Sequence, residues 1–273
     1  MTASRPLSRL EGPTGGIEYL DVGTGAPGTV FAHGLAGSIA TTRPFGTGVP
    51  GRRTFLHFRG HGGSDAPDGP WTYDALAEEL RAVADHVGAT RALGVSLGAG
   101  ALLALAARTP DRFERLVLVL PAIIDEPREP AALAHFTTLA DLVDEQDQDG
   151  IAAYFLDEQP ADVRESPAVR TWAADQARVL SGTAVARALR LLPHEVPLAD
   201  RSILAQVDAP VLIIGQEDDA THPVWAAREL ADALPRAEVE ILPPGGVLWG
   251  HRARVRELVA PFLSAPSPAR TGG

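Results

Sequence analysis

Short apolar runs alternate with longer segments of helical periodicity along most of the chain. The runs that resemble strands are residues 29–32, 54–58, 116–120, 211–214 and 239–242. Several are apolar throughout, as strands covered on both faces must be. Strands that alternate with helices in this way predict an α/β fold, in which a mostly parallel sheet is covered by helices on both faces.

Three segments carry apolar residues at helical spacing. One follows Trp71 and has Thr72 as its expected N-cap. The second follows Pro223, and the third ends near Leu263. In each, apolar residues recur every three or four positions, so one stripe of the helix should pack on the sheet.

The strand-like runs stop between Ile124 and Val207. This stretch is acidic and punctuated by prolines, and Ser166-Pro167 is typical of a helix start. The expected division is an α/β core of residues 1–123 and 208–264, a helical cap inserted at 124–207, and a flexible tail at 265–273. Ligands bind outside the carboxyl ends of the strands in open α/β sheets, so a cap inserted here would cover the site.

The charge and the cysteine content of the chain exclude several classes of binding partner and site. The formal net charge of -11, from 24 basic and 35 acidic residues, disfavours nucleic acid, and there is no cysteine for disulfides or thiolate metal sites. Residues 1–13 lack the apolar core of a signal peptide, and no later run is long enough to span a membrane. We expect a soluble, cytoplasmic protein with a small-molecule substrate and no membrane partner; the sequence leaves a homodimer open.

The segment Gly94-Val95-Ser96-Leu97-Gly98 carries the strongest chemical signal. It follows a short apolar run and precedes an alanine-rich helical segment. A Gly-x-Ser-x-Gly at such a junction bends the backbone sharply and presents the serine hydroxyl above the sheet. This context favours Ser96 as a nucleophile over a turn residue in a protein that only binds. A serine nucleophile also needs a neighbouring base and a carboxylate that orients the base.

Three motifs in order resemble the α/β-hydrolase family, in particular its capped esterase, lactonase and C–C-hydrolase branch. They are His33-Gly34-Leu35-Ala36-Gly37, Arg59-Gly60-His61-Gly62-Gly63-Ser64-Asp65, and the turn at Ser96. The resemblance extends from about Tyr19 to Leu263. It implies that the backbone N–H groups of Leu35 and Leu97 form the oxyanion hole and that His33 braces its loop.

The resemblance also implies an acid after the strand-like run 211–214. In the family this carboxylate stands a few residues beyond the strand and four before a proline. Asp219 satisfies the spacing to Pro223, whereas counting from Gly215 favours Asp218. We take Asp219 as the acid and keep Asp218 as the alternative.

The histidine departs from the family pattern. Aligned from the last strand, the customary position holds Val247, and the nearby candidate is His251. Either the glycine-rich loop brings His251 to Ser96, or His251 caps the last helix and the base is missing. His222 and His61 are further candidates, each more readily explained as a structural or exposed residue.

The expected function is hydrolysis of a small, mostly apolar ester, thioester or lactone by Ser96, Asp219 and His251. The eight histidines show no spacing of two histidines and a carboxylate on one helix, so a metal site has no support, and no cofactor is implied. Aromatic residues of the cap suit an apolar ligand, although they also suit packing. They are Phe136, Tyr154, Phe155 and Trp172, with Leu156 beside them and Trp249 near His251. The alternatives are cofactor-free cyclisation or elimination with an incomplete triad, and a non-catalytic small-molecule receptor.

Overall fold

An eight-stranded sheet forms the centre of the computed structural model, which describes residues 6–161 and 163–266. The strand order is β1-β2-β4-β3-β5-β6-β7-β8. Strand β2 pairs antiparallel with β1 and β4, and all other neighbours are parallel. The strands are β1 Ser8–Gly12, β2 Gly15–Val22, β3 Gly28–Ala32, β4 Arg52–Leu56, β5 Arg91–Val95, β6 Arg115–Val119, β7 Val211–Gln216 and β8 Ala237–Leu242. The predicted mostly parallel sheet is confirmed.

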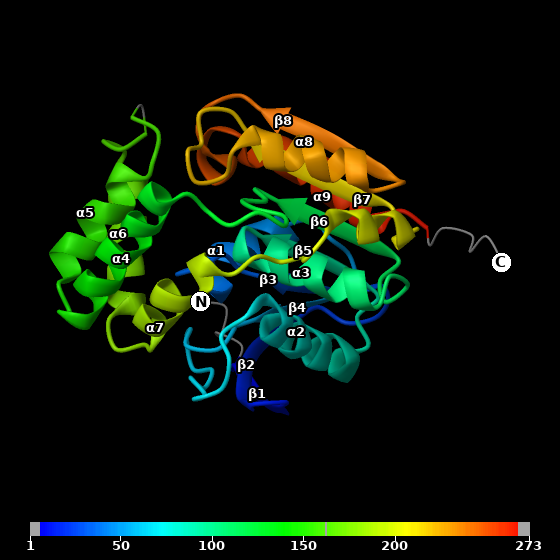
Figure 1. Cartoon of the computed structure of the whole chain (residues 1–273), viewed down its shortest axis with the longest axis horizontal. Coiled ribbons are helices and arrows are strands. Elements are labelled where there is room, and N and C mark those ends of the chain that lie inside the picture. The colour runs from blue at the N-terminus through cyan, green and yellow to red at the C-terminus, as the bar shows by residue number, and fades with distance from the viewer. Residues whose placement is uncertain (1–5, 162, 267–273) are drawn as a thin grey trace.

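Helices cover both faces of this sheet (Figure 1). On one face lie α2 (Tyr73–Val87), α3 (Leu97–Arg108) and α8 (Val224–Ala233). On the other lie α1 (Ile39–Thr42), η1 (Arg43–Gly46) and α9 (Arg252–Ser264). The two buried clusters are separate because alternate residues of each strand point to opposite faces.

The helical segments begin close to where their sequence predicts. The Thr72 side chain accepts a hydrogen bond from the N–H of Ala75 at 3.3 Å and so caps α2. Strand β4 starts two residues before the predicted run at 54–58. The antiparallel strands β1 and β2, which mix polar and apolar residues, were not among the predicted strands.

A group of helices occupies the segment between β6 and β7, where the sequence predicts an inserted cap. It contains α4 (Pro130–Asp144), α5 (Gln148–Asp157), α6 (Pro167–Leu180) and α7 (Val185–Leu191), followed by η2 (Leu192–His194) and η3 (Arg201–Gln206). Helices α4–α7 gather beside the sheet, at the left of Figure 1. We call these four helices the helical insertion.

Two arginines hold the chain after α9. Arg91 donates to the carbonyl of Ala265 at 2.9 Å, and Arg115 donates to that of Pro266 at 2.9 Å. The first two residues of the predicted tail are therefore fastened to the sheet. The rest of that tail, residues 267–273, lies outside the described residues.

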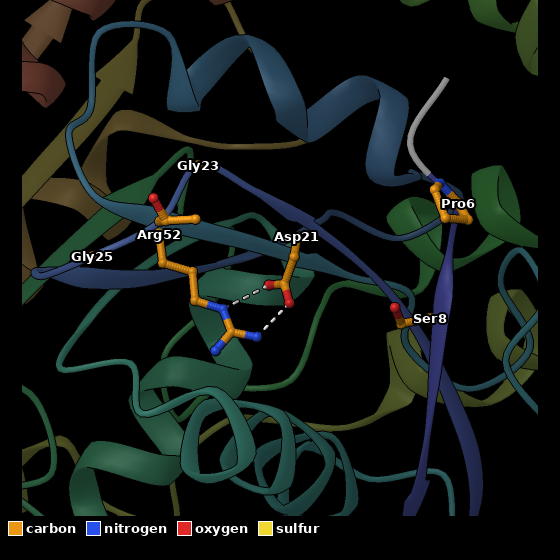
Figure 2. A pocket seen from close by; sticks show the side chains of 7 residues that line it. Pro6, Ser8, Asp21, Gly23, Gly25 and Arg52 are labelled. Carbon is orange, nitrogen blue, oxygen red and sulfur yellow. Dashed lines mark hydrogen bonds and ion pairs between the residues drawn. The ribbon is translucent and has the colours of Figure 1, made fainter. Parts of the chain in front are cut away.

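A cavity of about 430 Å³ lies at the edge of the sheet beside Asp21 and Arg52, which form an ion pair (Figure 2). Arg52 is the first residue of β4, whereas Ser96 follows the last residue of β5. Because these strands run in the same direction, the cavity lies at the end of the sheet opposite Ser96. Across residues 6–161 and 163–266, no helix combines the length and apolar character needed to cross a membrane.

Candidate active site

Ser96 occupies a strained turn between β5 and α3. Its φ of 49° lies in the left-handed region that non-glycine residues rarely adopt. The flanking glycines allow the close approach that this turn requires: a Cβ on Gly94 would lie 2.3 Å from the carbonyl oxygen of Gly98, and one on Gly98 would lie 2.4 Å from that of Ala32. The half-buried hydroxyl of Ser96 is thereby held at the carboxyl end of the sheet.

The histidine beside Ser96 is His222. Its Nε2 lies 2.9 Å from Ser96 Oγ, and its Nδ1 lies 2.9 Å from Asp219 Oδ2. A proton on Nδ1 donates to the carboxylate, which leaves Nε2 free to accept from the serine hydroxyl. The three side chains thus form a continuous serine, histidine and carboxylate chain of hydrogen bonds.

The loop after β7 orients the carboxylate of Asp219. Its Oδ1 accepts hydrogen bonds from the backbone N–H groups of Thr221 at 3.1 Å and His222 at 3.0 Å. Burial by itself raises the pKa of the Asp219 carboxyl, but the hydrogen bonds and charge of His222 outweigh burial and leave that pKa below its ordinary value. Asp218 is exposed and adopts a φ of 57°. The structure therefore brings Asp219, and not Asp218, to the histidine.

His251 does not reach Ser96, contrary to the first of the two outcomes that the sequence left open. Its Nε2 lies 3.0 Å from the carbonyl oxygen of Pro244, and the residue is the N-cap of α9. A π-helical turn, η4 (Gly246–Gly250), precedes it and leads into α9. Val247, at the customary histidine position, lines the cavity above Ser96. The histidine comes instead from the loop of the acid, three residues after Asp219.

A local signal for His222 exists in the sequence. Asp219 can cap the backbone of the residues that follow it, because aspartate side chains commonly accept hydrogen bonds two residues onward. Such a turn also brings the side chain of the third residue back to the carboxylate, as His222 shows. The Asp-x-x-His spacing therefore carried the information that the family pattern did not.

The expected oxyanion-hole residues flank Ser96. Leu97 is the first residue of α3, and the first N–H groups of a helix have no partner within it. Leu35 lies in the turn after β3, and both Leu35 and Ser96 line one cavity. Among the hydrogen bonds within 6–161 and 163–266, none uses the N–H of Leu35. Both donors are thus available to a bound oxygen.

Three buried histidines brace the turn that carries Leu35. The Nε2 atoms of His33, His57 and His61 accept from the N–H groups of Phe58 at 3.0 Å, Ile39 at 3.0 Å and Ala36 at 3.1 Å. Burial, together with the neighbouring histidines, lowers the pKa of His33 well below its ordinary value. Burial also lowers the pKa of His61 to about 4. These rings are therefore neutral supports, as expected for His33 and His61.

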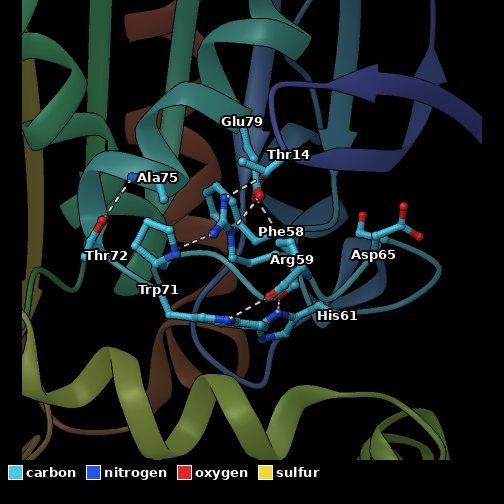
Figure 3. Close-up of polar contacts among 12 residues, drawn as sticks. Thr14, Phe58, Arg59, His61, Asp65, Trp71, Thr72, Ala75 and Glu79 are labelled. Atoms are coloured by element: carbon cyan, nitrogen blue, oxygen red, sulfur yellow. Dashed lines mark hydrogen bonds and ion pairs between the residues drawn. The ribbon is translucent and has the colours of Figure 1, made fainter.

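A buried ion pair fixes the loop that carries His61 (Figure 3). The guanidinium of Arg59 donates to Glu79 at 2.7 Å and to Thr14 at 2.9 Å, and the Arg59 N–H donates to Glu79 at 3.1 Å. Both side chains are almost fully buried. His61 Nδ1 donates back to the carbonyl of Arg59 at 2.9 Å. The ion pair is thus connected through His61 to the turn at Leu35.

A cavity of about 250 Å³ lies above Ser96, between the core and the helical insertion. This volume suits a small ligand, because pockets for drug-sized ligands usually exceed about 300 Å³. Of the apolar residues named from the sequence, those that line it are Phe136, Tyr154, Phe155 and Trp172. A second cavity of about 630 Å³ shares His135, Phe136, Glu158 and Thr221 with it and extends toward Trp225. The shared residues form the boundary between the two cavities.

No group of three or more metal-ligating side chains occurs in the part of the chain that the structure describes. The side chains of Ser96, His222 and Asp219 are instead joined to one another by hydrogen bonds.

Comparisons with known proteins identify the family and the fold. A family model described as "alpha/beta hydrolase fold" matches residues 30–202. The "Putative carbamate hydrolase RutD" of Caulobacter segnis is 29% identical over 234 residues, which cover 80% of this chain and 83% of that protein.

Solved structures give the same fold. An enol-lactonase from Burkholderia xenovorans LB400 aligns with a TM-score of 0.78 and 23% identity, covering 94% of this chain and 100% of that one. The carboxylesterase CesB of Bacillus subtilis aligns with a TM-score of 0.78 and 20% identity, covering 96% and 92%. The relatives named here are hydrolases, which supports a hydrolase enzyme in general terms. Since the family model matches more than half of its length, the chain belongs to the alpha/beta hydrolase fold family.

Proposed function

We propose that this protein is a serine hydrolase that cleaves a small, mostly apolar ester, thioester or lactone. The observation that carries the proposal is the pair of 2.9 Å contacts that link Ser96 to His222 and His222 to Asp219. A serine hydroxyl is a poor nucleophile at neutral pH and becomes reactive when a positioned base takes its proton. The carbonyl classes named on the enol-lactonase and carboxylesterase neighbours fit this chemistry.

The proposed reaction has two halves. Ser96 Oγ attacks the substrate carbonyl while His222 Nε2 takes the hydroxyl proton, and Asp219 stabilises the resulting imidazolium. The N–H groups of Leu35 and Leu97 receive the negative oxygen, each contributing about 3 kcal/mol of transition-state stabilisation. His222 then gives its proton to the leaving oxygen or sulfur, and an acyl ester on Ser96 remains. A water molecule, deprotonated by His222, releases the acid and restores the serine.

The two alternative functions, a rearrangement enzyme and a small-molecule receptor, do not need the complete set of serine, histidine and carboxylate. Cyclisation or elimination without hydrolysis was favoured by a missing base, and His222 at 2.9 Å from Ser96 removes that reason. A receptor needs a closed cavity but no aligned proton acceptor. We therefore place hydrolysis first and treat both alternatives as outcomes of the test.

The test measures acid release from p-nitrophenyl acetate, p-nitrophenyl butyrate and a small lactone. We expect saturable hydrolysis by the unaltered protein and a loss of at least about a thousand-fold in Ser96→Ala. The matched control is Ser202→Ala, at an exposed serine of η3. Absence of hydrolysis by a folded protein that binds these compounds would favour a receptor, and conversion without acid release would favour a rearrangement.

A further inference from the structure

One buried side chain in the wall of the cavity above Ser96 has no hydrogen-bond partner. Gln176 lies on α6 of the helical insertion, is 4% exposed and lines this cavity. Within the described ranges, its carboxamide makes no hydrogen bond. The amide atoms are not among the fully sealed polar atoms without a partner, so they are accessible from the cavity. A ligand that enters the cavity and displaces water there must replace the hydrogen bonds of this amide or lose free energy.

Several other polar residues of the same wall already have hydrogen-bond partners. The hydroxyls of Thr41 and Thr42 donate to the carbonyl of Ser38 at 2.9 and 2.8 Å. Gln159, the other glutamine of the cavity, accepts from Trp249 at 2.8 Å and donates to Phe155 at 3.1 Å. The free carboxamide of Gln176 is therefore available to something that enters the cavity.

The surroundings restrict what that ligand group can be. The cavity wall is rich in apolar and aromatic side chains and contains no lysine or arginine. Its carboxylate, Glu158, lies 3.2 Å from His135. A carboxylate would lack a counter-charge there, and a hydrocarbon would leave the carboxamide unsatisfied. A carbonyl or hydroxyl matches both the amide donor and the amide acceptor.

We infer that Gln176 is a substrate-recognition residue whose carboxamide hydrogen-bonds an uncharged carbonyl or hydroxyl of the substrate, away from the bond that is cleaved. Ser96 stands on the core and Gln176 on the insertion, so one substrate spans the cavity between them. This inference rests on the proposed hydrolysis at Ser96. It narrows the substrate class to acyl compounds with a second, uncharged oxygen function.

The test compares p-nitrophenyl hexanoate with its 4-oxo and 5-oxo analogues. We expect the unaltered protein to prefer at least one oxo ester by about tenfold or more in kcat/KM, because a site with an unpaired polar group rejects the analogue that cannot satisfy it. In Gln176→Leu this preference should fall close to one. Gln148→Leu, the same change at an exposed position of α5, should keep it.

The ratio of two substrates within one protein does not depend on the folded fraction, so partial misfolding of a variant cannot imitate the expected result. An unchanged ratio in Gln176→Leu would overturn the role of Gln176 while hydrolysis stands. If the unaltered protein cleaves none of the esters, the proposed function fails. In that case the affinity of Ser96→Ala for the methyl esters of the oxo and plain acids decides the inference. Tighter binding of an oxo ester that is lost when Gln176→Leu is added supports it. Equal affinity of Ser96→Ala for the oxo and plain esters overturns it.

Discussion

Asp219 and His222 lie three residues apart in one loop, and the carboxylate of the first holds both the ring and the backbone N–H of the second, at 2.9 and 3.0 Å. Acid and base are thus positioned by the same short segment. The arrangement makes the orientation of His222 depend on local turn geometry rather than on the packing of the loop after β8.

Asp219→Asn should lower kcat by about a thousand-fold or more. An asparagine amide can donate to His222 Nδ1, which puts the ring proton on Nε2 and prevents that atom from accepting the proton of Ser96. Asp218→Asn is the matched control, because asparagine tolerates the φ of 57° at that position. Initial rates of aryl ester hydrolysis compare the two variants. Equal losses of kcat in the two variants would show that the rate depends on the conformation of the whole loop rather than on the Asp219 carboxylate.

The sequence predicts the sheet and the turn at Ser96 because both depend on local patterns. Apolar runs mark the buried strands. Gly94 permits the tight approach between β5 and α3, and Gly98 permits that between α3 and β3. Asp219 was also accessible, from its spacing to Pro223. The sheet and the turn at Ser96 follow from residue types and their order, and Asp219 follows from the resemblance to the family.

The choice between His222 and His251 needs the path of two loops. Gly245 and Gly246 have φ values of 134° and 79°, and the π-helical turn that follows leads His251 to the Pro244 carbonyl. Residue types alone do not fix the path of the loop at His251, whereas the Asp-x-x-His spacing of Asp219 and His222 is a local signal that favours His222. The free carboxamide of Gln176 is equally invisible in the sequence, because it depends on what the facing elements leave unpaired.

Glu79→Gln should destabilise the protein far more than Glu78→Gln. Burial raises the pKa of Glu79 against the opposing effect of Arg59, and the pair is nearly sealed from water. Breaking a buried ion pair typically costs about 3–5 kcal/mol, because one charge stays behind without its partner. Glu78, its neighbour on α2, pairs with Arg81 and Arg108 at the surface, where such pairs contribute about 0–1 kcal/mol.

Urea unfolding of both glutamate variants measures this difference. A loss for Glu79→Gln no larger than that for Glu78→Gln would mean that water or a rearranged side chain compensates Arg59. A selective loss of activity in the folded variant would further link the ion pair to the turn at Leu35 through His61.

The His61 ring should make stability sensitive to acid. Its folded pKa of about 4 lies below the ordinary value of 6.5, so the unfolded chain binds the proton first as the pH falls. The free energy of unfolding therefore decreases between pH 6.5 and pH 4, by about 3 kcal/mol for this group alone, and the loss is complete below pH 4. His61→Gln should be less stable at pH 7 but should lose less on acidification.

Urea unfolding at intervals between pH 7 and pH 4 checks this, with His194→Gln at an exposed position as the control. The control should follow the unaltered protein. A pH dependence that His61→Gln leaves unchanged would assign the acid sensitivity to other groups, such as His33 and His57 beside it.

The rate at which a fluorophosphonate labels Ser96 tests the identity of the base most directly. Intact-mass measurements follow labelling in the unaltered protein, His222→Ala and His251→Ala, each shown to be folded by circular dichroism. The hydrogen bond between His222 and Ser96 predicts a loss of at least about a thousand-fold in His222→Ala and a change of less than about threefold in His251→Ala. Rapid labelling of His222→Ala together with a lost reaction in His251→Ala would contradict it.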